Sequence, residues 1–455
     1  MLRRNPMMRM KYRENPVTLK IQAFFPRILS QFAGRLAKRG VIIIIDQAIV
    51  SASNFLTSVI IGRVLTKEAF GIYALGFNAV LLMVSLQSTL ILTPYAVYCP
   101  RFREKRLSTY TGSTIIHQLA FSFMSILVFM AGAIAARNGL GPVKLRTLFW
   151  TLAGVILFVL FREYARQINF AQLKVHTALL LDIAVVVIQI IGLVLAALLK
   201  VLSPKTAFWI IGLANCGPAT VWLLAKRPDF IVRFKDVKHD FSMNIKYAKW
   251  LFAGALTYWA SVQIQPWLLS AFHGPEATGL LAACQGVLFF ANPLLLGMTN
   301  FLLPHASHLY TSGGIGELKR LVKYTTRVLI LVMGFFCAGM MIWGSRLVYL
   351  IYGHKYTNTG MIVAILALSQ FSSSITFPAN SALLAIHRPD VGFKSFLLAL
   401  VITVTIGVWL VKSRGVIGVA EGLLLAHVVA AAYRLWQFSK LSRSQATQTV
   451  TEPMR

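Results

Sequence analysis

The sequence is poor in acidic residues and in charged residues of every kind. Asp and Glu together account for 14 of its 455 residues, and charged residues for 13%, compared with about a quarter in a typical soluble protein. Its four cysteines are scattered and form no CxxC pair, so the sequence predicts neither a thiolate metal site nor a disulfide framework. P-loop, HExxH and G-x-S-x-G motifs are absent, which argues against the common nucleotide-binding and hydrolytic enzymes.

Long apolar runs are the dominant feature. Apolar residues make up 57% of the chain, the mean hydropathy is +0.69, and the runs reach about 20 residues, enough to cross a bilayer as helices. The runs are continuous rather than alternating, which excludes a β-barrel. The predicted spans are 41–62, 70–93, 113–136, 147–168, 178–199, 206–225, 247–271, 279–303, 326–350, 361–386, 393–411 and 416–438.

The net charge of +31 is explained by topology. About three quarters of the 45 Lys and Arg residues fall on the side that holds both termini, the bias that the positive-inside rule describes for cytoplasmic loops. The basic segments therefore predict cytoplasmic N and C termini in contact with anionic lipid, and they do not indicate binding to nucleic acid.

The longest polar interruption divides the spans into two groups of six. The predicted units are a basic cytoplasmic N-terminal tail, a first bundle, a cytoplasmic linker, a second bundle and a cytoplasmic tail, at 1–40, 41–225, 226–246, 247–438 and 439–455.

A short internal repeat relates the two groups. The pattern E-A-x-G-x-x-A begins at Glu68 and again at Glu276, and P-x-A begins at Pro94 and again at Pro304. With six spans in each half, the halves have the same orientation, which predicts a parallel repeat about an axis along the membrane normal. We therefore expect an all-α polytopic membrane protein, with about 12 transmembrane helices in two six-helix bundles related by a pseudo-twofold axis. A central cavity between such bundles is typical of secondary transporters.

Three motifs suggest a family. The first is S-x-x-N-F at 51–55, the second is R-x-L-x-x-x-x-F-G-x-Y at 63–73, and the third is G-x-x-G-x-A at 415–420. With the arginine-containing segment at 161–171, they resemble the polysaccharide-exporter branch, including O-antigen (Wzx-type) flippases, of the multidrug/oligosaccharidyl-lipid/polysaccharide flippase superfamily.

This resemblance implies a function and partners. It implies a flippase that moves undecaprenyl-diphosphate-linked oligosaccharide across the bacterial inner membrane by alternating access, for O-antigen, capsule or exopolysaccharide assembly. Its partners would be that substrate, anionic lipid and other polysaccharide-assembly proteins. The coupling ion would be H⁺ or Na⁺, and we expect no other cofactor and no metal.

Polar residues inside several spans are candidates for the cavity wall. Amide and hydroxyl groups suit sugar hydroxyls, because each can donate and accept hydrogen bonds. The alternative is packing between helices, where small and polar residues are favoured. The cavity candidates are Asp46, Asn54, Arg63, Asn78, Gln265, Gln285, Asn292 and Asn380.

Two charged features have competing interpretations. Arg162 and Arg166 share one helix face and are candidates to bind the lipid diphosphate, for which the planar guanidinium is well suited. The alternative is positive-inside anchoring. Asp46 is a candidate for proton or cation coupling, or it simply faces the cytoplasmic interface.

Three other functions stay open. An ion-coupled drug exporter of the same fold would need acidic groups deep in the membrane, where this chain has few. A membrane glycan ligase or polymerase would need a large outward loop, and no such loop is predicted. A scaffold without transport activity is the third.

Overall fold

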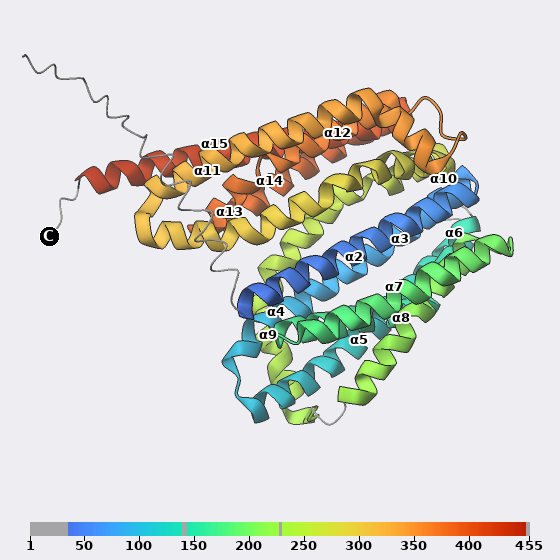
Figure 1. Ribbon diagram of the computed structural model, residues 1–455, viewed down its shortest axis with the longest axis horizontal. Coiled ribbons are helices and arrows are strands. Elements are labelled where there is room, and N and C mark those ends of the chain that lie inside the picture. Colours follow the sequence, from blue (N-terminus) through green and yellow to red (C-terminus); the bar gives the residue numbers. More distant parts are fainter. Residues whose placement is uncertain (1–34, 139–142, 227–229, 452–455) are drawn as a thin grey trace, which may run out of the picture.

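The computed structural model describes residues 35–138, 143–226 and 230–451, so most of the predicted basic tail lies outside the described residues. Within those ranges the chain is helical and contains no strand. Figure 1 shows the helices of the first half, in blue to green, beside those of the second half, in yellow to red.

The first bundle contains the helices from α2 to α8. In chain order they are α2 (Arg35–Val64), α3 (Lys67–Gln87), the π-helix η1 (Ser88–Leu92), α4 (Thr93–Tyr98), the 3₁₀-helix η2 (Cys99–Arg101), α5 (Glu104–Arg137), α6 (Val143–Ala171), α7 (Val175–Leu198) and α8 (Pro204–Lys226). Helix α3 follows α2 after a short turn, where the Thr66 side chain accepts a hydrogen bond from the backbone N–H of Ala69 and caps the new helix. Helix α6 packs against both α5 and α8, and α7 packs against α2.

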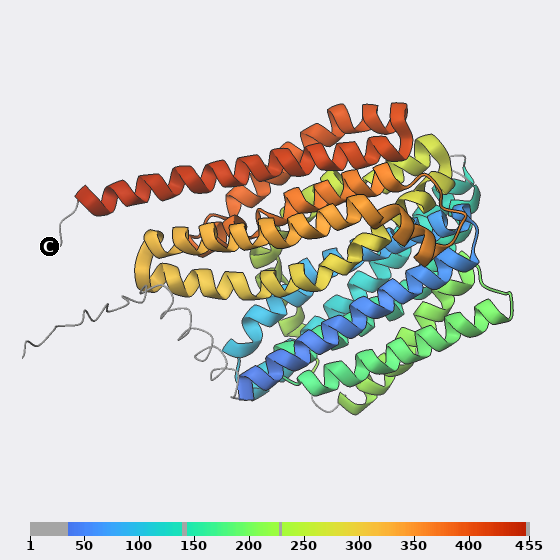
Figure 2. The same cartoon turned by 45° about the horizontal axis from the view of Figure 1, so that its top comes forward.

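The second bundle contains the helices from α9 to α15. They are α9 (Phe234–Tyr258), the π-helix η4 (Trp259–Gln263), α10 (Gln265–Leu288), the 3₁₀-helix η5 (Phe289–Ala291), α11 (Asn292–Tyr352), α12 (Gly360–Ser374), α13 (Phe377–Ala385), α14 (Pro389–Ile402), the π-helix η6 (Thr403–Gly407) and α15 (Val408–Thr451). Helix α15, drawn in red in Figure 2, extends past the other described helices, so much of the predicted C-terminal tail is helical.

Three glycines divide helical segments of the second half into separate membrane crossings. Gly274, Gly314 and Gly415 interrupt α10, α11 and α15 with φ of 81°, 64° and 57°, a region that glycine enters without steric cost. Ten helical stretches of the described chain are long and apolar enough to cross a membrane. Divided at these turns, they accommodate the twelve predicted spans. The chain is a multi-pass membrane protein, and the predicted all-α fold of two six-helix bundles is confirmed.

Helix α9 connects the two bundles and extends across the boundary that we predicted at residue 247. It contacts α5 of the first bundle and α14 of the second. Arg106 of α5 forms an ion pair with Asp240 of α9, and the Tyr110 hydroxyl donates a hydrogen bond of 2.8 Å to Asn244 Oδ1. Much of the predicted linker is therefore helical, and it packs against the first bundle.

Candidate functional site

A cavity of about 870 Å³ lies between the two bundles. Its wall is formed by α2 and α3 of the first bundle and, in the second bundle, by residues of α9 to α15 with the short helices η4 and η5. Its volume lies at the upper end of the range of small-molecule sites. It is therefore large enough for the head group of a substrate but not for a folded partner.

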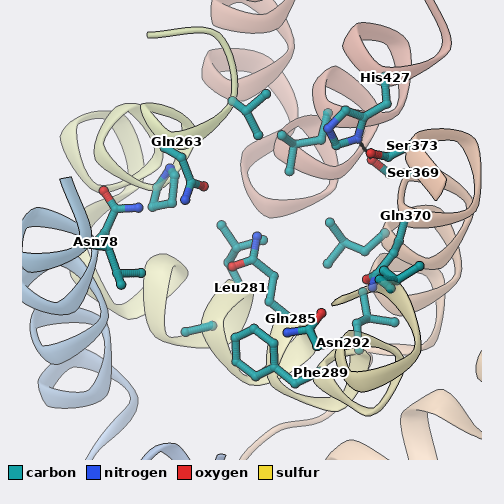
Figure 3. Close-up of a pocket in the computed structure, with 18 of the residues that line it drawn as sticks. Asn78, Gln263, Leu281, Gln285, Phe289, Asn292, Ser369, Gln370, Ser373 and His427 are labelled. Carbon is teal, nitrogen blue, oxygen red and sulfur yellow. Dashed lines mark hydrogen bonds between the residues drawn. The ribbon is translucent and has the colours of Figure 1, made fainter. Parts of the chain in front are cut away.

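Uncharged polar groups of both bundles face this cavity (Figure 3). The amide side chains are Asn54, Asn78, Gln263, Gln285, Asn292 and Gln370, and the hydroxyl groups include those of Ser369 and Ser373. Aromatic rings lie between them, among them Phe55, Phe77 and Phe289. A wall that combines amides with aromatic faces can bind polyols by hydrogen bonds and by stacking.

The only charged side chain among the described lining residues is Arg434, and none of these residues is Asp or Glu. Arg434 lies on α15 and is 8% exposed. Its Nε donates a hydrogen bond of 2.7 Å to Ser395 Oγ, and its guanidinium lies 4.7 Å from the ring centre of Phe396. Two helical turns earlier on α15, His427 Nδ1 lies 2.8 Å from Ser369 Oγ.

At one end of the cavity α3 and α10 are in backbone contact. A Cβ added to Gly71 would lie 1.8 Å from the carbonyl oxygen of Pro275, and one added to Gly279 would lie 2.0 Å from that of Lys67. The ammonium of Lys67 pairs with Glu276 at 3.7 Å. We call this region, where α3 meets α10, the closed end.

Tyr352, the last residue of α11, fills the space between bundles next to this contact. It is fully buried, it packs against Gly62 of α2 and Gly286 of α10, and its hydroxyl lies 3.1 Å from Ser58 Oγ. Just outside the membrane-spanning part, Lys355 donates a hydrogen bond to the Arg63 carbonyl oxygen at 3.0 Å. Desolvation, reinforced by the positive charge of Lys67, lowers the pKa of Lys355.

A second cluster of charges is buried inside the first bundle, away from the cavity wall. Arg166 binds Asp46 Oδ2 and Asp182 Oδ2 at 2.6 Å each, and Arg162 binds Asp182 Oδ1 at 2.5 Å. Glu163 lies 3.1 Å from Arg162 and 3.5 Å from Arg166. The cluster ties α2, α6 and α7 together, and each guanidinium in it has carboxylate partners.

Four of the eight predicted cavity residues line the cavity. These are Asn54, Asn78, Gln285 and Asn292. Asn78 also crosses between the bundles, since its Oδ1 accepts a hydrogen bond of 2.9 Å from the Trp267 indole.

The other four lie elsewhere. Asp46 is fully buried against Arg166. Arg63 is at the closed end, where its Nε donates a hydrogen bond of 2.8 Å to the carbonyl oxygen of Ile351. Gln265 is fully buried next to Gly407 and Gly422, and neither of its amide atoms has a hydrogen-bond partner among the described residues. Asn380 is on α13, outside the described lining residues.

The two predicted diphosphate contacts, Arg162 and Arg166, lie in the buried cluster and not at the cavity wall. Glu163 lies beside them on α6, but Asp46 and Asp182 come from α2 and α7, and these contacts between helices could not be predicted from the sequence. Gln263, Ser369, His427 and Arg434 line the cavity and were not predicted. His427 and Arg434 had a usable signal, because both are ionisable residues inside the predicted span 416–438 and lie seven residues apart on one helix face.

No group of three His, Cys, Asp or Glu residues in the described chain is arranged to hold a metal ion. All four cysteines are free, and Cys216 is the half-buried one while the others are buried.

Comparison with known proteins gives matches by structure but not by sequence. No known protein family and no curated protein matches the sequence. An inward-facing multidrug resistance MATE family transporter of the MOP superfamily superposes with a TM-score of 0.74, at 13% identity over 88% of this chain and 96% of that chain.

Two further solved structures also superpose on this chain. The lipid II flippase MurJ, in an inward closed conformation, gives a TM-score of 0.67 at 13% identity over 90% of this chain and 93% of that chain. A MOP superfamily transporter from Pyrococcus furiosus gives 0.64 at 12% identity, over 89% of this chain and 94% of that one. The chain thus has the two-bundle membrane fold that these MOP superfamily transporters share.

Proposed function

We propose that the protein is a flippase that moves an undecaprenyl-diphosphate-linked oligosaccharide across the bacterial inner membrane. The supporting observation is the polarity of the cavity, whose described lining residues include six amide side chains and no Asp or Glu. Amides match sugar hydroxyls, and the absence of carboxylates removes repulsion against an anionic diphosphate. The lipid chain stays in the bilayer while the head group occupies the cavity.

The direction of transport follows from the predicted topology. With both termini in the cytoplasm, the closed end faces outward, and the cavity receives its substrate from the cytoplasmic leaflet. The higher TM-score against the inward-facing MATE structure, 0.74 compared with 0.62 for an outward-facing one, supports this orientation of the cavity. Separation of α3 from α10 then releases the head group outward, driven by an H⁺ or Na⁺ gradient or by the membrane potential. Anionic lipid contacts the basic face, and other polysaccharide-assembly proteins supply and consume the substrate.

A drug exporter of the same fold is the second candidate. It is favoured by the TM-score of the MATE family transporter, which exceeds that of the lipid II flippase. An exporter of organic cations gains from carboxylates in its binding site, because an opposite charge offsets the desolvation of the cation. The described cavity wall has none, and this favours the flippase.

Transport by the purified protein in vesicles separates the two functions. A lipid-diphosphate oligosaccharide with a fluorescent sugar is placed in both leaflets, and loss of signal to an impermeant quencher reports flipping. Ethidium uptake is measured in parallel. We expect the protein to flip the glycolipid and not to carry ethidium, and the reverse result would overturn the proposal.

A cavity-filling variant provides the internal control. Ala52 lies on the cavity wall, so Ala52→Trp is expected to abolish flipping. Leu331 is 72% exposed on the outer surface of the bundle, so Leu331→Trp is expected to retain it. Equal activity in both variants would show that transport does not pass through this cavity.

A further inference from the structure

Arg434 is a buried cation without a counter-charge among the described residues. Its one hydrogen bond to the described chain is the contact of Nε with the neutral Ser395 hydroxyl. Its Nη1 and Nη2 have no partner in the described residues, and no described Asp or Glu lies within ion-pair distance. The side chain is 8% exposed, and it borders the cavity.

This arrangement differs from that of the other internal arginines. Arg162 is held by two carboxylate groups and Arg166 by three, all at 3.5 Å or less. An isolated charge in a membrane protein is costly and is retained where it serves a function. An anion in the cavity would supply the missing charge, so the cavity is complete only when it holds one.

The neighbours of Arg434 leave its terminal nitrogens available. Phe396 lies against the guanidinium plane at 4.7 Å, and Ser395 holds Nε at 2.7 Å. Tyr258, also on the cavity wall, packs edge-on against Phe396 at 5.2 Å. Together they fix the plane of the guanidinium, and a fixed guanidinium can bind a phosphate through two parallel hydrogen bonds.

We propose that Arg434, backed by Ser395 and Phe396, binds a phosphate group of the lipid-linked substrate, while the amide residues bind its sugars. This inference rests on the proposed function, and it transfers the diphosphate contact from Arg162 and Arg166 to α15. It divides the cavity into a phosphate subsite and a sugar subsite.

Equilibrium binding of isoprenoid lipids tests the phosphate subsite without requiring transport. Native mass spectrometry of the full-length protein in neutral detergent measures the binding of undecaprenyl diphosphate and of undecaprenol. Arg434→Gln removes the charge. Ala431→Glu keeps the arginine but adds a carboxylate to the cavity wall one turn away, so it decides the question if Arg434→Gln fails to fold.

Both variants are expected to weaken undecaprenyl diphosphate binding about ten- to hundredfold, the value of a lost charge-assisted hydrogen bond. Undecaprenol binding should not change. Arg434→Lys should retain part of the affinity, and Arg414→Gln, at an exposed ion pair with Glu421, should retain all of it. Unchanged diphosphate binding in Ala431→Glu and Arg434→Gln would overturn the proposal.

A competition arm identifies the source of the phosphate. If phosphatidylglycerol at equal concentration displaces undecaprenyl diphosphate, Arg434 binds lipid phosphate in general, and the assignment to the substrate is overturned. If it does not, the assignment stands. A protein that binds undecaprenyl diphosphate through Arg434 but flips no oligosaccharide would overturn the proposed function and leave the phosphate subsite intact.

Discussion

Gly71 of α3 and Gly279 of α10 occupy the same position of the repeated E-A-x-G motif, and each lies against the residue that precedes the motif of the other bundle. A Cβ at Gly71 would meet the Pro275 carbonyl oxygen, and a Cβ at Gly279 would meet that of Lys67. The two contacts are therefore equivalent under the pseudo-twofold axis. The repeat keeps glycine at both positions because only glycine allows the backbones to approach this closely.

Gly71→Val is expected to separate α3 from α10 at the closed end. The added side chain overlaps a backbone carbonyl group that cannot rotate away, and overpacking of this kind costs about 1–3 kcal/mol, enough to reduce the closed population about tenfold. Crosslinking of Lys67→Cys to Glu276→Cys by a short bis-maleimide, in a Cys216→Ser background, measures that population. Gly254→Val is the matched control, since a Cβ there meets no atom within 4 Å apart from its chain neighbours, and equal crosslinking in both variants would contradict the prediction.

Arg166→Gln is expected to destabilise the first bundle by about 3–5 kcal/mol, because it leaves the buried Asp46 carboxylate without its described charge partner and leaves Asp182 with Arg162 alone. Unfolding in detergent, followed by temperature or denaturant, measures the loss. Adding Asp46→Asn should recover part of it, since the second change removes one of the unpaired charges. Arg320→Gln breaks an ion pair whose arginine side chain is 81% exposed, so its effect should stay below about 1 kcal/mol. Similar losses in the two single variants would count against a structural role for the buried cluster.

Gln265→Leu is expected to leave stability unchanged or to raise it. Neither amide atom of Gln265 has a described hydrogen-bond partner. The substitution therefore replaces an unsatisfied polar side chain with an apolar side chain of similar size. Gln87 is also fully buried, but its Nε2 donates to Gln118 at 2.6 Å and to the Leu160 carbonyl oxygen at 2.7 Å. Gln87→Leu should therefore cost about 1–3 kcal/mol. Thermal unfolding of Gln265→Leu and Gln87→Leu under the same conditions compares their stabilities. A larger loss of stability for Gln265→Leu than for Gln87→Leu would contradict the prediction.

Cysteines introduced in place of two glutamines of α10 should differ in their reactivity toward a polar thiol reagent. Gln285 lines the cavity, whereas Gln265 is fully buried. In the Cys216→Ser background, Gln285→Cys is expected to react with a small polar methanethiosulfonate and Gln265→Cys is not, since a thiol must be accessible to react. Mass spectrometry of the labelled protein gives the modified fraction. Comparable labelling at both positions would show that the cavity extends beyond the wall described above.

The fold could be predicted from the sequence because each crossing carries its own apolar run of about 20 residues. The repeat then related the two halves, since the E-A-x-G motif, at Glu68 and at Glu276, comes just before the second crossing of each half. These signals are local or nearly so, and they do not depend on which helices are neighbours.

The site was predicted only in part, because its composition depends on contacts between distant helices. The Asp46 carboxylate meets Arg166, 120 residues further along the chain, and this pairing removes both from the cavity. Arg434 lies four residues before the end of the predicted span 416–438, and no role was predicted for it. The helix continues to Thr451, which leaves Arg434 well inside the helix rather than at its end.

The packing of α9 determines where the two bundles can move relative to each other. Its first half is fixed to α5 by the Arg106–Asp240 ion pair and the Tyr110–Asn244 hydrogen bond, and the chain passes from it through η4 into α10. We therefore expect rotation of one bundle against the other to bend the chain at η4, where the π-helical hydrogen bonds already depart from the α-helical pattern. Tyr258, just before η4, and Gln263, its last residue, also line the cavity, so an occupant of the cavity would contact the segment where we expect the bend.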